Sequence, residues 1–168
     1  KTITYGNAVG GDLEAVNIYD SLIMAYSGVK CDIAIVTMGP GIVGTGTKYG
    51  FSGIEQGYII DSINTLNGIP VFIPRISFCD SRERHYGISH HTLTVLSEIA
   101  KTPAHVIFPV LQHDKSTYIK SQINMKNIQK KHIVKFIKSD VLYKAVDFYK
   151  VSVNTMGRNI NQDKEFFL

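Results

Sequence analysis

The fold is decided by residues 31–38, which read Cys-Asp-Ile-Ala-Ile-Val-Thr-Met and are apolar almost throughout. An unbroken apolar run of this length is typical of a strand that is covered on both faces of a parallel sheet. Comparable runs recur along the chain, and segments of helical period separate them. We therefore expect strands near 2–5, 32–38, 71–73, 105–110 and 132–138, and helices near 13–27, 53–67, 90–101, 115–126 and 140–149.

This alternation predicts an α/β fold with right-handed βαβ crossovers. We expect a mostly parallel sheet with helices on both faces, a Rossmann-like arrangement in three layers. The 168 residues suit one domain over 1–168, which can bury a core without disulfides. Because the chain starts at Lys1, we expect it to begin inside a longer protein.

The composition excludes several classes of protein. With 44% hydrophobic and 19% charged residues, the chain is not of the disordered class. It has neither a signal-peptide pattern nor a run of about 20 apolar residues, so we expect no membrane span. Cys31 and Cys79 form no C-x-x-C pair and are expected as reduced thiols in the cytoplasm.

The net charge of +4 is uneven, since most of the excess lysines lie in the C-terminal third. These lysines are scattered and accompany neither an arginine cluster nor a Gly-aromatic motif. A solvated basic face therefore accounts for them better than a nucleic-acid interface.

Three loops that follow predicted strands hold the unusual residues, at the sheet edge where ligands usually bind. The first is Gly-Asn-Ala-Val-Gly-Gly-Asp-Leu-Glu at 6–14. Here Asp12 is expected to be either a helix N-cap or a catalytic carboxylate. Glu14 in the first helical turn is a second candidate for acid/base catalysis, and its charge also favours the helix dipole.

The second loop, Gly-Pro-Gly-Ile-Val-Gly-Thr-Gly-Thr at 39–47, begins with the spacing G-x-G-x-x-G. A dinucleotide site is not favoured, because the capping-box sequence Ser-Gly-Ile-Glu at 52–55 puts the helix start too late. Two interpretations remain: a tight structural loop, or a concavity of N–H and O–H donors for an anion. The candidate anion-binding residues here are Gly39, Gly41, Gly44, Thr45, Gly46 and Thr47.

The third loop, residues 74–91, holds three arginines and three of the six histidines. Arginine forks suit phosphate or carboxylate, and histidines with nearby acids suit a metal ion or proton transfer. The alternative is a self-satisfied loop in which Asp80 and Glu83 pair with Arg82 and Arg84. Since adjacent helical residues point about 100° apart, we expect only one of His90 and His91 to face a site. The candidates are Arg75, Arg82 and Arg84 for an anion, His90 and His91 for catalysis, and His85 with Asp80 for a metal.

These motifs together resemble a bacterial family known as domain of unknown function 3866. The resemblance rests on residues 10–17, on 38–47, and on Pro-Arg-Ile-Ser-Phe at 74–78 through Arg84-His85 to Ser89-His90-His91, with Met-Gly-Arg at 156–158. It implies that the chain corresponds to the C-terminal half of the family's longer members. It implies no known activity.

From the residues we expect an enzyme that acts on a small anionic substrate, phosphorylated or not, with a divalent metal as an open alternative. Asp12, Thr45, Arg75 and His90 should then line one cleft. A non-catalytic ligand-binding or regulatory module would use the same pocket. In a subunit-assembly domain, the loops would instead hold partner subunits, for example in a homo-oligomer.

Overall fold

The computed structural model describes residues 1–39, 41–138, 141–150 and 152–167. Its largest sheet has three strands in the order β3-β6-β7: Val71–Phe72, His105–Pro109 and Ile133–Ile137. Strand β6 pairs in parallel with β3 on one side and with β7 on the other. The expectation of a parallel sheet is therefore confirmed for the predicted strands near 71–73, 105–110 and 132–138.

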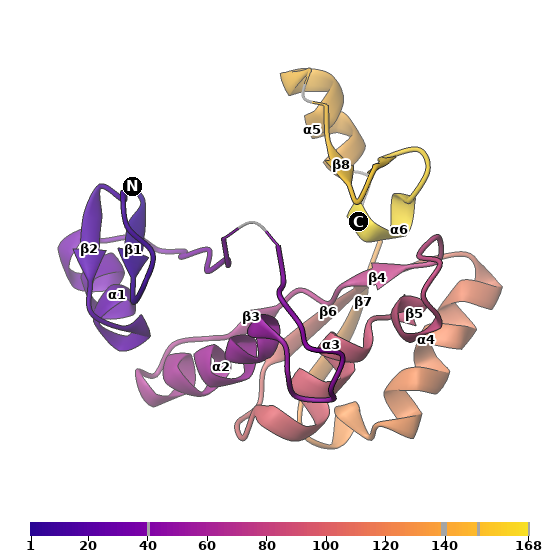
Figure 1. Ribbon diagram of the computed structural model, residues 1–168, viewed down its shortest axis with the longest axis horizontal. Helices are drawn as coiled ribbons and strands as arrows, with labels where there is room; N and C mark the ends of the chain where they lie inside the picture. The colour runs from indigo at the N-terminus through magenta and orange to yellow at the C-terminus, as the bar shows by residue number, and fades with distance from the viewer. Residues whose placement is uncertain (40, 139–140, 151, 168) are drawn as a thin grey trace.

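Helices connect the strands and cover one face of the sheet (Figure 1). Between β3 and β6 runs α3 (His90–Thr94), which continues into the π-turn η4 (Val95–Ile99). Between β6 and β7 runs α4 (His113–Met125), followed by the 3-10 turn η5 (Ile128–Lys130). Before β3, the 3-10 turn η2 (Ser52–Ile54) leads into α2 (Glu55–Thr65).

The core lies between this face of the sheet and the helices. Alternate strand residues point into it: Phe72 is buried on β3, and Val106 and Phe108 are fully buried on β6. From the helices come Ile60, Leu96 and Ile119. Burying such side chains is the main stabilising term for a domain of this size.

The other face of the sheet is open. Val71, Ile133 and Ile137 point to this face and are 59%, 49% and 47% exposed. In the described part of the chain, helices therefore cover one face and not both, which corrects the expectation. The structure is a mixed α/β arrangement with small, partly parallel sheets, and a Rossmann-like three-layer fold is not confirmed.

The first 28 residues form a small unit whose helix contacts α2. Strand β1 (Ile3–Tyr5) pairs in parallel with β2 (Leu13–Ala15), and α1 (Ile18–Ile23) with the π-turn η1 (Met24–Gly28) follows. The predicted helix start at residue 13 is wrong, because residues 13–15 return alongside β1. Asn17 is the N-cap instead, and its Oδ1 accepts from Asp20 N at 3.1 Å.

Residues 31–38 form no strand, which is the largest departure from the sequence prediction. Their side chains are mostly exposed, with Ile33 at 83% and Ile35 at 88%. The segment runs between the N-terminal unit and the helical layer without pairing to any described strand (Figure 1).

The C-terminal part adds α5 (Val141–Tyr149), the antiparallel pair β8 (Asn154–Thr155) and β9 (Arg158–Asn159), and α6 (Lys164–Phe167). Helix α6 contacts β4 (Ile76–Ser77), a strand of the third loop. The end of the chain therefore meets the residues that the sequence singles out for function.

Candidate functional site

The third loop is a folded structure of its own. Strand β4 (Ile76–Ser77) pairs antiparallel with β5 (Gly87–Ile88), and the 3-10 turn η3 (Glu83–His85) lies between them. Gly87 has a φ of +70°, and a Cβ there would meet Tyr118 and Gln122 on α4 at less than 3 Å. A side chain at this position would be both strained and obstructed, so the glycine fixes the loop against α4.

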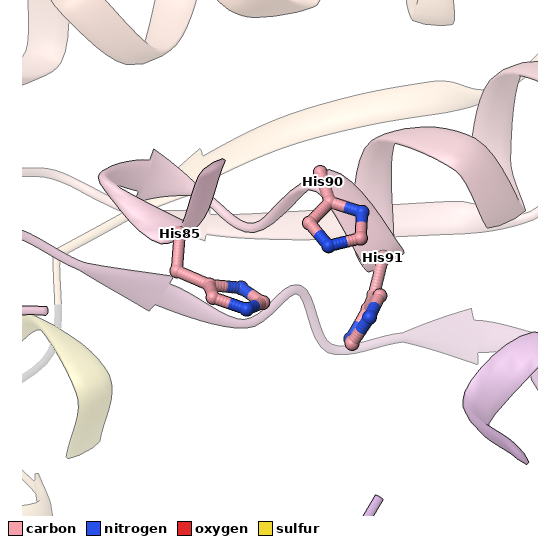
Figure 2. A group of neighbouring side chains, drawn as sticks. All are labelled: His85, His90 and His91. Carbon is pink, nitrogen blue, oxygen red and sulfur yellow. The ribbon is translucent and has the colours of Figure 1, made fainter. Parts of the chain in front are cut away.

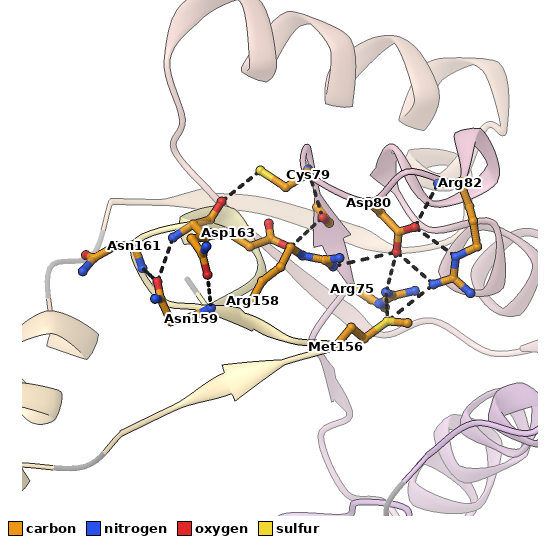
Figure 3. Close-up of polar contacts among 11 residues, drawn as sticks. Arg75, Cys79, Asp80, Arg82, Met156, Arg158, Asn159, Asn161 and Asp163 are labelled. Atoms are coloured by element: carbon orange, nitrogen blue, oxygen red, sulfur yellow. Dashed lines mark hydrogen bonds and ion pairs between the residues drawn. The ribbon is translucent and has the colours of Figure 1, made fainter.

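Asp80 is the anchor of the loop (Figure 3). Its carboxylate is 2% exposed and accepts from Arg82 N, Nε and Nη2 and from Arg75 Nη2, all at 2.9–3.0 Å. These donors hold the pKa of Asp80 far below its usual range, the hydrogen bonds from Arg82 being the largest cause. The expected pairing of Asp80 with Arg82 is present, and Arg75 joins it.

The C-terminal segment closes over this cluster. Met156 Sδ accepts from Nη2 of both Arg75 and Arg82 at 3.4 Å. Arg158 Nη2 lies 3.9 Å from Asp80 Oδ2, and its Nε donates to Asp163 Oδ2 at 2.9 Å. Asp163 is completely buried and also accepts from Ser77 Oγ at 2.8 Å.

Arg158 and Asp163 are the site residues that sequence reasoning missed. The only signal was the motif Met-Gly-Arg at 156–158, which carries the family resemblance but shows no partner. Two atoms of this pair, Arg158 Nη2 and Asp163 Oδ1, are buried without a hydrogen-bond partner.

Three histidine rings meet beside the arginine cluster (Figure 2). His85 ends η3, and His90 and His91 begin α3. One ring nitrogen of each lies within 4.8 Å of the others. The expectation that only one of His90 and His91 faces the site is corrected, because both rings turn toward His85 and their centroids are 4.1 Å apart.

Two of these histidines have free nitrogens. His90 Nε2 and His91 Nδ1 are buried and have no hydrogen-bond partner. His85 Nδ1, by contrast, accepts from Arg75 Nη1 at 3.0 Å and lies 2.8 Å from Ser89 Oγ. Ser89 also caps α3, accepting from His91 N at 3.3 Å, as its position in the sequence predicts.

All three histidines are held in the neutral form. Burial lowers the pKa of His85 to about 3 and of His91 to about 4, and it lowers that of His90 as well. The positive charges of nearby arginines contribute in the same direction. A neutral imidazole is the form that binds a metal ion or accepts a proton.

The second loop reaches this site through Phe51. Its ring stacks on His91 with centroids 4.1 Å apart, and residue 51 forms an isolated bridge with Gly44. The turn between them is closed by its own bonds, since Thr45 N donates to Gly50 O at 2.7 Å. The hydroxyls of Thr45 and Thr47 lie 3.0 Å apart. Ser52 does not cap α2, because its hydroxyl accepts from Val43 N.

Residues Gly39, Gly41 and Gly46 of the second loop are exposed, and Pro40 lies outside the described residues. Within the described part of the chain, none of the glycines of the second loop is hydrogen-bonded to Arg75, Arg82 or Arg84. The second loop therefore borders the histidines, and its six candidate residues form no anion cradle with the arginines.

The first loop lies elsewhere. Asp12 accepts from Thr2 N at 2.7 Å, and Glu14 accepts from Thr4 Oγ1 at 2.6 Å and Gly10 N at 2.8 Å. These bonds lower the pKa of Glu14, with the Thr4 hydroxyl as the first cause. Figure 1 shows the β1-β2 unit well away from the third loop. Of the three loops expected at one cleft, the second and third therefore lie together, and the first, with Asp12 and Glu14, lies apart from them.

The remaining candidates have plain environments. Arg84 is exposed and has no hydrogen-bond or ion-pair partner in the described part of the chain. Cys79 is exposed; its Sγ donates to Gln162 O at 3.0 Å, and desolvation raises its pKa. A raised pKa makes the thiolate scarcer and disfavours a nucleophilic role.

Within the described residues, none of the helices is long and apolar enough to cross a membrane. No curated protein and no solved structure matches the sequence. One family model does, described as "Protein of unknown function (DUF3866)", and it covers residues 1–168. The narrower expectation of a C-terminal half is slightly off, because the match extends over the whole chain. The chain belongs to the DUF3866 family of proteins of unknown function.

Proposed function

We propose that this protein is an enzyme that acts on a small anionic substrate at a divalent metal ion held by His85, His90 and His91. The observation that carries the proposal is the convergence of three neutral histidines, whose ligand atoms lie within 4.8 Å of one another. Buried imidazole nitrogens without partners, such as those of His90 and His91, are costly unless something binds them.

The donor set suits zinc or a similar transition metal. Zinc takes imidazole nitrogens at about 2.0–2.1 Å in tetrahedral geometry, so three ligands leave a fourth position open for substrate or water. Ligand nitrogens in such a site are about 3.4 Å apart, a spacing that follows from those bond lengths. Small rotations of the three rings would bring the nitrogens from their present separations to that distance.

His85 needs a particular tautomer to take part. If its Nε2 binds the metal, Nδ1 must carry the proton and donate it to an acceptor. Ser89 Oγ, 2.8 Å away, is suited to that role, whereas Arg75 can only donate. Metal binding through Nε2 would therefore move the Arg75 guanidinium off His85 and leave it with Asp80. Ser89 is a positioning residue in this scheme.

The surrounding charges argue for an anionic substrate. Arg75, Arg82 and Arg158 surround Asp80 and Asp163, so positive charge is in excess even before Arg84 is added. Burial is the first cause of the lowered pKa of His90 and His91, and the positive charge of Arg84 contributes to both. A phosphate or carboxylate between the metal and Arg84 would offset this excess.

The proposal leaves out Asp12 and Glu14, because the β1-β2 unit lies away from the histidines. A non-catalytic binding module would use the same ligands. Turnover of model phosphate esters by the zinc-loaded protein separates the two.

Thermal unfolding of chelator-treated protein with added zinc or manganese tests the site. Ligand at about 100 times its Kd stabilises the native state by about 2.7 kcal/mol, which raises the Tm of a chain this size by about 5–10 °C. We expect this shift in the wild type and its loss in His91→Ala. The control is His113→Ala, since His113 is exposed on α4 and outside the cluster.

Two results would contradict the proposal. One is an equal metal shift in a variant that lacks all three histidines. The other is stabilisation by phosphate alone that chelators leave unchanged and that Arg84→Ala abolishes, which would indicate an anion site without metal.

A further inference from the structure

The exposed apolar segment Ile33–Thr37 and the free edge of β3 are complementary features of one chain. Strand β3 is at the edge of the three-stranded sheet, so the backbone N–H and C=O groups of Val71 face no other strand of the described chain. An unpaired edge of this kind is a template for a further strand. The side chains beside it, Ile69, Val71 and Ile73, are 76%, 59% and 81% exposed.

Helix α2 is already placed as a crossover helix. Its N-terminal end is near the carboxyl edge of the sheet, because Phe51 stacks on His91 at the start of α3. Its C-terminal end is at the amino edge, where Asn64 Nδ2 donates to Pro103 O at 2.8 Å, just before β6. The helix therefore runs antiparallel to the strands, as a βαβ connection requires.

The position of α2 also determines where its preceding strand belongs. Helices α3 and α4 cross between sequential strands on one face, and α2 lies on the same face against η4, where Gly57 packs on Ile99. A right-handed crossover through α2 into β3 requires the earlier strand to be next to β3, on its free side. The residues that precede α2 with a strand pattern are 31–38.

We propose that Ile33–Thr37 docks on the free edge of β3 as a fourth parallel strand of the same chain. The segment is apolar, rich in β-branched residues and free of charge from Ile33 to Met38, as a strand within a parallel sheet requires. In the present structure, it is exposed, and burial against β3 would remove Ile33 and Ile35 from water.

Docking would also complete the candidate site. The second loop would then follow a strand adjacent to β3, and Gly39 and Gly41 would come to the carboxyl edge where the third loop begins. Their backbone N–H groups could then face the same anion as Arg84. This consequence rests on the proposed function, whereas the docking itself does not.

Hydrogen exchange of the unmodified protein tests the docking directly. We expect the amides of 33–37 to exchange much more slowly than those of 6–11, an exposed turn in the same chain. Exchange of 33–37 at the rate of an unstructured peptide would overturn the proposal.

A crosslink identifies the occupant. In a background of Cys31→Ser and Cys79→Ser, the pair Ile35→Cys and Val71→Cys should be linked within one chain by a short bis-maleimide. The control pair is Val9→Cys with Val71→Cys, since Val9 is 84% exposed in the N-terminal unit. A covalent dimer in place of the internal link would assign the edge to a second copy and overturn the proposal.

The variant Ile35→Pro gives a third measurement, because proline cannot donate to a ladder inside a sheet. Docking predicts a Tm lower by about 4 °C or more, with Val9→Pro as the control. In zinc-loaded Ile35→Pro protein, we expect weaker phosphate binding with unchanged zinc affinity. If the wild type binds no zinc but residues 33–37 are still protected from exchange, only the metal proposal fails. A Tm of Ile35→Pro equal to that of the wild type would count against docking.

Discussion

Two stretches of this chain are almost equally apolar and have opposite environments. Residues 31–38 are exposed and unpaired, whereas His105–Pro109 is the central strand of the sheet, with Val106 and Phe108 fully buried. The difference lies in their neighbours. Strand β6 has a strand on each side and helices over one face, and residues 31–38 have neither. An apolar run therefore indicates a capacity to pair, and its partners determine whether a strand forms.

The largest expected effect is in the packed stretch. Phe108→Ala should lower the free energy of unfolding by about 3–5 kcal/mol, because truncation of this fully buried side chain leaves a cavity in the core. Ile35→Ala should cost about 1–2 kcal/mol if residues 33–37 dock, and less than about 0.5 kcal/mol if they stay exposed. Denaturant unfolding measures both. A cost for Ile35→Ala as large as that of Phe108→Ala would remove the contrast between the two stretches.

A second contrast concerns carboxylates. Asp80→Asn removes the charge that faces Arg75 and Arg82, and we expect a loss of about 2–3 kcal/mol, less than for a fully buried pair because the arginines are partly exposed. Asp12→Asn in the N-terminal unit is the matched control and should change stability by less than about 0.5 kcal/mol. Equal losses of stability in Asp80→Asn and Asp12→Asn would show that Asp80 does not hold the third loop in place.

A third contrast is a pH dependence confined to the packed region, since all six histidines lie between residues 85 and 132. The pKa values of His85 and His91, about 3 and 4, are below their unfolded value of about 6.5. Between those limits, the unfolded state binds more protons, so stability falls as the pH falls. The slope is at most about 1.4 kcal/mol per pH unit for each histidine.

Denaturant unfolding at several pH values between about 7 and 4.5 measures this slope. The double variant His85→Gln/His91→Gln should lose most of it. If the wild type and the variant have the same slope over this range, the histidines are not the groups responsible.

The sequence predicts the elements that depend on local pattern. Strands β3, β6 and β7, helix α4 and the Ser89 cap lie where periodicity and capping chemistry place them. The predicted start of the first helix at residue 13 is wrong because residues 13–15 pair with β1, and no periodicity shows that a turn at 10–11 brings the chain back beside β1. The prediction of helices on both sheet faces is wrong for a similar reason, since a sequence pattern shows which side chains are apolar and not what covers them.

The candidate site is predicted in part. Clustered arginines and histidines at 75–91 mark the third loop correctly, and Asp80 has the arginine partner expected of it. Arg158 and Asp163 could not be found, because Asp163 is 86 residues from its partner Ser77 and no spacing rule covers that distance. The expectation that only one of His90 and His91 faces the site rests on the angle of about 100° between adjacent helical residues. The two imidazole rings nevertheless lie side by side, with centroids 4.1 Å apart.

The bond between Ser77 and the buried Asp163 has a consequence for the kinetics of folding. The connections between β3, β6 and β7 are shorter than the stretch from Ser77 to Asp163, so the sheet can assemble through shorter loop closures. The contact of the C-terminal segment with β4 must wait until the chain between these two residues, which are 86 positions apart, is ordered. Interactions that form after the transition state mainly slow unfolding. We therefore expect this bond to contribute to the lifetime of the native state more than to the speed at which it forms.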